Sequence, residues 1–159
     1  MEQFNCDWGT RTYLVTAVVL VILTGISIYM LWKRKRKLVP VFIIVLLWMF
    51  PITILFRWMP TNIFVDDTNL IIKGIARNIA VIALENITSI ERYEQTETTI
   101  RKLGSGGCFG DLGEFENKQL GIFQMYVTNE KNMVLIKTKT ETYVVSCENP
   151  DLLIQHIIN

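Results

Sequence analysis

The residues with the greatest chemical potential in this chain lie in a glycine-rich stretch, residues 104–115 (GSGGCFGDLGEF). The stretch holds five glycines, together with Ser105 and Cys108, whose side chains can act as nucleophiles. Glycine-rich segments can cradle a phosphate with backbone N–H groups, and they also let a chain bend or two backbones approach closely. Three roles are therefore open: a phosphate site, a nucleophile, or a conformational role.

The glycine spacing does not fit a nucleotide-binding loop. Counted from Gly104, the pattern G-x-x-x-x-G-K-[ST] requires a glycine where Phe109 stands, and the dinucleotide pattern G-x-G-x-x-G fails at the same residue. Acidic side chains at Asp111, Glu114 and Glu116 would also repel a phosphate. We therefore expect no nucleotide and no other cofactor here.

Covalent chemistry at Cys108 stays open as an alternative function. A reactive thiolate needs a base or a positive neighbour, and the single histidine, His156, is expected on the surface of a C-terminal helix. The three cysteines, Cys6, Cys108 and Cys147, are not spaced like metal ligands, so no metal is predicted. In an oxidising compartment Cys108 and Cys147 could form a disulfide, although the odd cysteine count weakens that idea.

A conformational role fits the surroundings of the glycines best. Residues 95–120 form a connection that is long for a link between two strands. Apolar side chains recur along it: Leu103, Phe109, Leu112, Phe115 and Leu120. Either they pack beneath a β domain as a small secondary core, or some of them contact the bilayer or a partner chain.

The elements that must position this stretch begin with two apolar runs, residues 13–32 and 38–56, neither of which contains a charge. At about 1.5 Å per residue, each makes a helix of about 30 Å, the thickness of the hydrocarbon core of a bilayer. The first run is not typical of a signal peptide, because its basic cluster follows the apolar residues. We therefore predict an N-terminal tail (residues 1–12) and a transmembrane helical hairpin (residues 13–58).

The residues between the two runs are all basic: Lys33, Arg34, Lys35, Arg36 and Lys37. The positive-inside rule places such a loop in the cytoplasm, with both chain ends on the other side. We expect a multi-pass protein of the cell (inner) membrane, with the lipid bilayer as a partner and the remaining domain extracytoplasmic. The basic loop would also contact anionic lipids.

The remainder of the chain, residues 57–159, has ten Lys and Arg against thirteen Asp and Glu, so it presents no basic face and nucleic acid is not an expected partner. Short runs rich in Val, Ile, Thr and Tyr alternate with turn residues and predict about seven strands. They cover residues 62–65, 70–74, 79–83, 88–94, 122–128, 133–139 and 142–147.

A short amphipathic helix is predicted at the end of the chain. Asn149, Pro150 and Asp151 are typical of a helix start, as N-cap, first-turn proline and first-turn acid. The apolar residues that follow recur at helical spacing and predict a face that packs on the strands. They are Leu153, Ile154, Ile157 and Ile158.

About seven strands followed by one helix is the order of elements in a pleckstrin-homology (PH) domain, and the motifs extend the likeness. LENITSIERYE (84–94), GSGGCFG (104–110), a strand ending in Thr128–Asn129, a valine-rich hairpin and NPD (149–151) resemble the bacterial PH-like family. The resemblance covers roughly residues 60–159 and implies an all-β PH-like barrel closed by a C-terminal helix. It also implies a membrane anchor, because such proteins often carry one or two N-terminal membrane helices.

The resemblance favours a non-catalytic binding or assembly module over an enzyme. The candidate binding loop is Gly104, Ser105, Gly106, Gly107, Phe109, Gly110 and Phe115, with a protein partner or self-association expected. PH domains that bind phosphoinositides place Lys and Arg around the first hairpin, where this chain has Asp66 and Asp67, so that ligand is not expected. A thiol enzyme or redox protein at Cys108 and a lipid-surface sensor remain the alternative functions.

Overall fold

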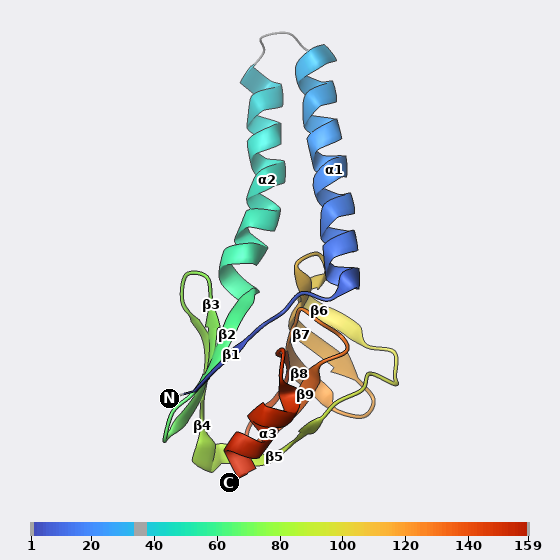
Figure 1. Cartoon of the computed structure of the whole chain (residues 1–159). Helices are drawn as coiled ribbons and strands as arrows, with labels where there is room; N and C mark the ends of the chain where they lie inside the picture. Colours follow the sequence, from blue (N-terminus) through green and yellow to red (C-terminus); the bar gives the residue numbers. More distant parts are fainter. Residues whose placement is uncertain (1, 34–37, 159) are drawn as a thin grey trace.

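A computed structural model describes residues 2–33 and 38–158 (Figure 1). Two long helices, α1 (Thr10–Lys33) and α2 (Leu38–Trp58), stand side by side and project from one end of a β domain. They cover the two apolar runs, so both predicted helices are confirmed, and α1 starts three residues before the predicted span. Lys33 is exposed in the last turn of α1, while the predicted loop residues 34–37 lie outside the described residues.

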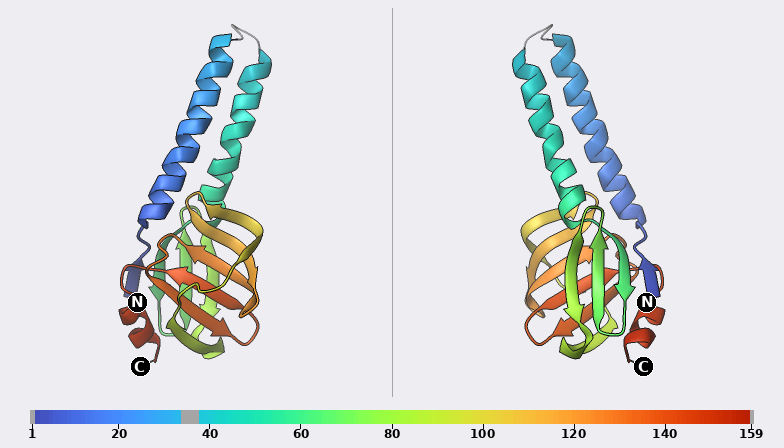
Figure 2. Two further views of the ribbon diagram at one scale, coloured as in Figure 1. Left: turned by 90° about the vertical axis from the view of Figure 1, so that its right-hand side faces the viewer. Right: turned by 90° about the vertical axis from the view of Figure 1, so that its left-hand side faces the viewer.

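The first sheet contains a strand that precedes the helices. Its order is β1 (Glu2–Asn5), β2 (Pro60–Val65), β3 (Asn69–Gly74) and β4 (Asn78–Ala83). β1 falls within the segment expected to be a tail, and it pairs antiparallel with β2, with Phe4 opposite Ile63. The two helices are therefore inserted between neighbouring strands of one sheet, and both ends of the helical hairpin are fixed to that sheet (Figures 1 and 2).

The second sheet has six strands in the order β5-β9-β10-β8-β7-β6. β9 and β10 form the predicted valine-rich hairpin, and β10 runs parallel to β8. The strands are β5 (Ile87–Arg92), β6 (Ile100–Gly107), β7 (Gly110–Asn117), β8 (Gly121–Val127), β9 (Met133–Thr138) and β10 (Thr142–Ser146). A short 3-10 turn, Leu84–Asn86, joins this sheet to β4.

From residue 60 onward the described chain has nine strands, so the expected number of about seven was too low. The two additional strands are β6 and β7, which occupy the stretch that was expected to be a long loop. Glycine is depleted in strands in general, and the many glycines there concealed the pairing. The strands lie in two sheets, of four and six strands, and the expected single barrel is thus a two-sheet domain.

The main core lies between the two sheets and under the C-terminal helix, α3 (Pro150–Ile158). Fully buried residues come from the first sheet (Ile63, Leu70), the second sheet (Ile136) and the helix (Leu153). α3 begins at Pro150 as predicted, but Ile158 is exposed and does not belong to its packed face. Fully burying one Leu or Ile side chain contributes roughly 1.5–3 kcal/mol, so this cluster is the main source of stability.

The predicted acidic turn between β2 and β3 is closed by its own carboxylate. Oδ1 of Asp66 accepts hydrogen bonds from the backbone N–H groups of Thr68 (2.8 Å) and Asn69 (2.7 Å). These bonds hold the pKa of Asp66 below its ordinary value. Asp66 therefore has a structural role in this hairpin.

Candidate functional site

The glycine-rich stretch folds into a tight hairpin, here called the glycine hairpin: β6, β7 and the two-residue turn Cys108–Phe109. Gly107 lies opposite Gly110 across the turn, and Phe109 has a positive φ of 62°. The hydroxyl of Ser105 donates a 2.6 Å hydrogen bond to the carbonyl oxygen of Cys108, which braces the turn. A bulky residue at positive φ is strained by about 1–3 kcal/mol, so the surroundings of Phe109 must hold it in place.

Two glycines lie directly opposite each other in the middle of the glycine hairpin. Gly104 pairs with Gly113, and both have φ near +120°. A Cβ at Gly104 would lie 1.9 Å from the carbonyl oxygen of Leu112, and one at Gly113 would lie 2.2 Å from that of Leu103. The predicted conformational role of the glycines is therefore a close approach of two backbones.

The tip of the glycine hairpin is bonded to the start of α1. The backbone N–H of Phe109 donates a 2.9 Å hydrogen bond to Oγ1 of Thr16, and both groups are buried. One turn earlier, the hydroxyl of Thr12 donates a 2.8 Å bond to the carbonyl oxygen of Thr128, the residue that follows β8. The β domain thus contacts α1 as far as residue 16, which lies inside the predicted span.

The other side of the same tip packs against the end of α2. Ile54, Phe109 and Leu112 form a buried apolar group, here called the junction cluster, with Ile54 only 3% exposed. Partly buried residues complete it: Trp8, Leu55, Trp58, Met59 and Cys108. The hairpin tip therefore lies against both helices, and its apolar side chains fix the β domain at the helix ends.

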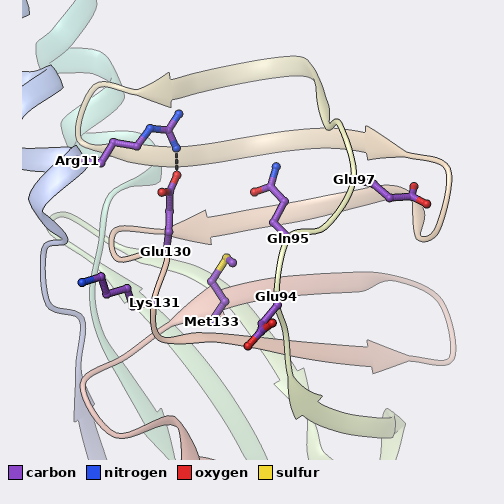
Figure 3. A pocket seen from close by; sticks show the side chains of 7 residues that line it. All are labelled: Arg11, Glu94, Gln95, Glu97, Glu130, Lys131 and Met133. Carbon is purple, nitrogen blue, oxygen red and sulfur yellow. Dashed lines mark ion pairs between the residues drawn. The ribbon is translucent and has the colours of Figure 1, made fainter.

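A polar network surrounds the junction cluster on the α1 side. Arg11 bonds to Asp111 at 3.2 Å and also contacts Glu130. Burial raises the pKa of Asp111, and the neighbouring guanidinium of Arg11 opposes that rise. Figure 3 shows that Arg11 and Glu130 point toward each other at the edge of an open cavity of about 550 Å³. Glu94, Gln95, Glu97, Lys131 and Met133 line the rest of that cavity.

The candidate binding loop is mostly turned inward. Phe109 is 7% exposed, and Phe115 is 5% exposed and packs near Phe123 with the ring centroids 6.4 Å apart. Ser105 is also buried, whereas Gly106 is exposed. Neither phenylalanine ring faces solvent, because each fills a core position. Leu103, which was expected either to pack in a small secondary core or to contact the bilayer or a partner chain, is 62% exposed and does not pack in a core.

The structure leaves the three thiols free and does not join Cys108 to Cys147. Burial raises the pKa of Cys108, and no charged or basic partner offsets that rise among the causes of its shift. Cys147 lies in the main core with a pKa raised to about 11, and Cys6 packs beside it. Within the described residues no group of three metal-binding side chains comes together.

His156 sits at the surface of α3, as expected, and contacts the N-terminal strand. Its Nδ1 lies 3.3 Å from a carboxylate oxygen of Glu2, and its ring is tilted against Phe4 with 6.4 Å between centroids. His156 and its two partners lie at opposite ends of the chain, and no sequence pattern indicated this contact. Neither partner belongs to the glycine hairpin, so His156 is not placed to activate Cys108.

The β domain consists of two sheets closed by a C-terminal helix, which is the architecture of a PH-like module. A pair of apolar helices is attached to it. A sequence model of the bacterial PH domain matches residues 61–158, which is more than half of the chain. The chain belongs to the bacterial PH domain family. Comparison with curated proteins gave no match, and comparison with solved structures gave none either.

Proposed function

We propose that this chain is a non-catalytic binding module of PH fold that two transmembrane helices hold directly on the membrane surface. The observation that carries the proposal is the insertion of α1 and α2 between the paired strands β1 and β2. Contacts at Thr16 and Ile54 lie inside the predicted spans, so both helices pack directly on the domain. Only Met59 lies between α2 and β2. A module fixed in this way would present one constant face along the bilayer.

The surface of the two helices supports their placement in lipid. Only 6% of the most apolar window of α1, and 11% of that of α2, is buried by protein. A core helix of a soluble domain would bury a much larger face. The indole N–H of Trp48 in α2 donates a 3.2 Å hydrogen bond to Oγ of Ser27 in α1. This bond satisfies two polar side chains that would otherwise lack partners in an apolar environment.

The charge distribution supports an extracytoplasmic β domain. Both helices join the β domain at one end, and α1 ends at Lys33 at the opposite end. Lys33 is the first residue of the basic segment 33–37 of the sequence. The positive-inside rule then keeps that segment in the cytoplasm of the cell and the β domain outside it. Tyr29 and Trp32 are exposed near the far end of α1, where interfacial aromatic residues are common.

The binding surface that we propose is the outer face of β6 and its free edge. β6 is the last strand of the six-stranded sheet, and its second half contacts the helices, so the free part is near residues 100–103. Ile100 and Leu103 are each about 60% exposed there, beside Glu114 and Glu116 of β7. Ile122 of β8 is equally exposed and lies opposite Glu116. Such an edge can accept an extended peptide as an additional strand, with pockets for its apolar side chains.

The alternative thiol function has less support. The raised pKa of Cys108 leaves its sulfur protonated at neutral pH, so the group is a poor nucleophile. Replacement of Cys108 by Ser separates the binding module from the thiol enzyme, because the variant of a binding module should still fold and still bind its partner. Loss of an enzymatic turnover that the wild-type chain shows, with the fold of the variant intact, would instead establish the thiol function.

Membrane extraction and a topology reporter test the anchor. The full-length protein should stay in the pellet after alkaline carbonate washing and should dissolve only with detergent. A reporter that is active only outside the cytoplasm, fused after Asn159, should give signal. Release by carbonate contradicts the anchor, and signal from a cytoplasm-only reporter at the same position contradicts the orientation.

Site-specific crosslinking tests the binding surface. A photoreactive residue at Leu103 should give a discrete adduct in intact membranes, and one at Val81, equally exposed on the edge strand β4, should not. Equal adducts at both positions, or none at Leu103, would remove β6 as the binding edge. The Val81 variant is the matched control, because it probes the other sheet of the same molecule.

A further inference from the structure

An apolar cavity of about 510 Å³ lies between the two helices and the glycine hairpin. Val19 and Leu23 of α1 line it on one side, Leu46 and Phe50 of α2 on the other, and Gly106 at the end near the hairpin. Its size falls in the range of about 300–1,000 Å³ that is usual for small-molecule sites. If the helices cross the membrane, this cavity opens at the level where the bilayer meets the β domain.

One charged side chain lies at the hairpin end of this apolar cavity. Arg101 lines both the apolar cavity and an adjoining polar cavity of about 450 Å³ that contains Arg11 and Asp111. Arg11 is bonded to Asp111 and Lys102 is bonded to Glu116, whereas Arg101 takes part in no ion pair within the described residues. Arg101 therefore forms no ion pair within the described residues and stands where an apolar site meets a polar one. Its charge acts on the nearby carboxylate of Asp111, but that carboxylate is already bonded to Arg11.

We propose that this cavity is a phospholipid site, in which one acyl chain lies between α1 and α2 and the lipid phosphate binds Arg101. This assignment rests on the proposed function, because it requires the helices to be in the bilayer. The guanidinium provides a planar set of N–H donors that matches two phosphate oxygens, and such charge-assisted bonds are among the strongest in proteins. Gly106 lies beside this guanidinium, since a Cβ there would be in ordinary contact with Nη1 of Arg101 at 3.4 Å.

The polar end must supply most of the selectivity. Lipid tails are as apolar as Leu side chains, so an acyl chain gains little by exchanging bulk lipid for the cavity wall. A phosphate that meets Arg101 gains a charge-assisted bond that bulk lipid does not offer. We therefore expect discrimination between lipids that share acyl chains and differ only in the phosphate headgroup.

Native mass spectrometry of the detergent-solubilised full-length protein tests the site. The probes are phosphatidylglycerol and a diacylglycerol with the same acyl chains. The wild-type chain should retain one phosphatidylglycerol about tenfold more tightly than the diacylglycerol. Arg101→Gln should remove this preference, and Lys102→Gln, a neighbouring cation that is paired with Glu116, should keep it.

A second pair of variants tests the apolar part and keeps the proposal falsifiable if Arg101→Gln fails to fold. Leu46→Trp fills the cavity and should lower the retention of both lipids, while Val45→Trp lies outside the lining and should behave as wild type.

Equal retention of the two lipids by the wild-type chain would overturn the site, and so would an unchanged preference in Arg101→Gln. A dimer that Leu46→Trp dissociates would assign the cavity to a second copy of the chain and also overturn it. The carbonate wash separates the two failures: a carbonate-soluble protein refutes the anchor, whereas an integral protein without lipid preference refutes the lipid site alone.

Discussion

The backbone N–H of Phe109 donates a hydrogen bond of 2.9 Å to Oγ1 of Thr16, although the two residues are 93 positions apart. This bond joins the strained tip of the glycine hairpin to the first turns of α1. On its other side Phe109 packs in the junction cluster with Ile54 of α2. One residue therefore connects the six-stranded sheet with both helices.

We predict that Thr16→Val loosens this connection. The variant removes the acceptor and leaves the buried N–H of Phe109 without a partner, at a cost of about 1–3 kcal/mol in the free energy of unfolding. Thr16→Ser should recover most of the loss. Thr24→Val is the control, because the hydroxyl of Thr24 bonds only within its own helix. Amide hydrogen exchange at Phe109 measures the effect, and unchanged protection in Thr16→Val would contradict it.

We predict that Gly113→Ala destabilises the protein by about 2 kcal/mol or more, because the new methyl group meets the carbonyl oxygen of Leu103 at 2.2 Å and φ is positive. Gly106→Ala in the same hairpin is the matched control. Its Cβ would make only ordinary contacts with side chains, Nη1 of Arg101 at 3.4 Å and Oδ1 of Asp111 at 3.8 Å, and its φ is not in the strained region. Thermal unfolding in one detergent compares the variants, and equal midpoints would show that the close approach of the strands is not required.

We predict that Phe4→Ala unfolds the domain more easily, by about 3–5 kcal/mol, because Phe4 is 7% exposed and belongs to the main core. Gln3→Ala on the same strand should change the free energy of unfolding by less than about 0.5 kcal/mol, since Gln3 is exposed. Denaturant unfolding measures both variants. Equal stability of Phe4→Ala and wild type would mean that β1 is not an integral strand of the sheet.

Acid should weaken the attachment of α3. Arg92 donates two 2.8 Å hydrogen bonds to the carboxylate of Asp151, which holds the pKa of Asp151 below its ordinary value of 3.8. A lowered folded-state pKa means that the contribution is present above pH 3.8 and is lost as the pH falls through the folded value. The unfolding midpoint of Asp151→Asn should therefore lie below that of wild type at pH 6, and the two should converge in strong acid.

The size of that difference should also depend on salt, because the Arg92–Asp151 pair is exposed and is screened by ions. Arg92→Lys keeps the charge and loses the paired geometry, so it should recover only part of the difference. A gap between wild type and Asp151→Asn that persists unchanged to strong acid would show that another property of Asp151 stabilises α3.

Much of this architecture could be predicted because its signals are local. The charge-free runs predict long apolar helices, and alternation of β-branched residues predicts most of the strands. Pro150 marks the start of α3, as predicted from the preference of proline for the first turn of a helix. The sequence also carries the motifs of the bacterial PH-like family, which the family match over residues 61–158 confirms.

The glycine hairpin shows where local signals misled. Glycines lower the strand preference of any segment, so β6 and β7 looked like one long loop. The role of these glycines is visible only in the paired strands, where Gly104 lies opposite Gly113. Two backbones without Cβ atoms can approach closely at that point. The inward placement of Phe109 and Phe115 likewise depends on what lies opposite each ring, which no local pattern contains.

The sequence by itself determined the character of each segment. It predicted two apolar helices, a β-rich remainder, and a glycine-rich segment without the spacing of a phosphate loop. Those properties depend on residues that are neighbours along the chain. Only the tertiary structure decided that residues 2–5 complete the first sheet, that Thr16 binds the hairpin tip, and that Arg101 lines an apolar cavity between the helices. Each of these joins residues far apart in sequence, and such contacts arise only when the packed fold brings them together.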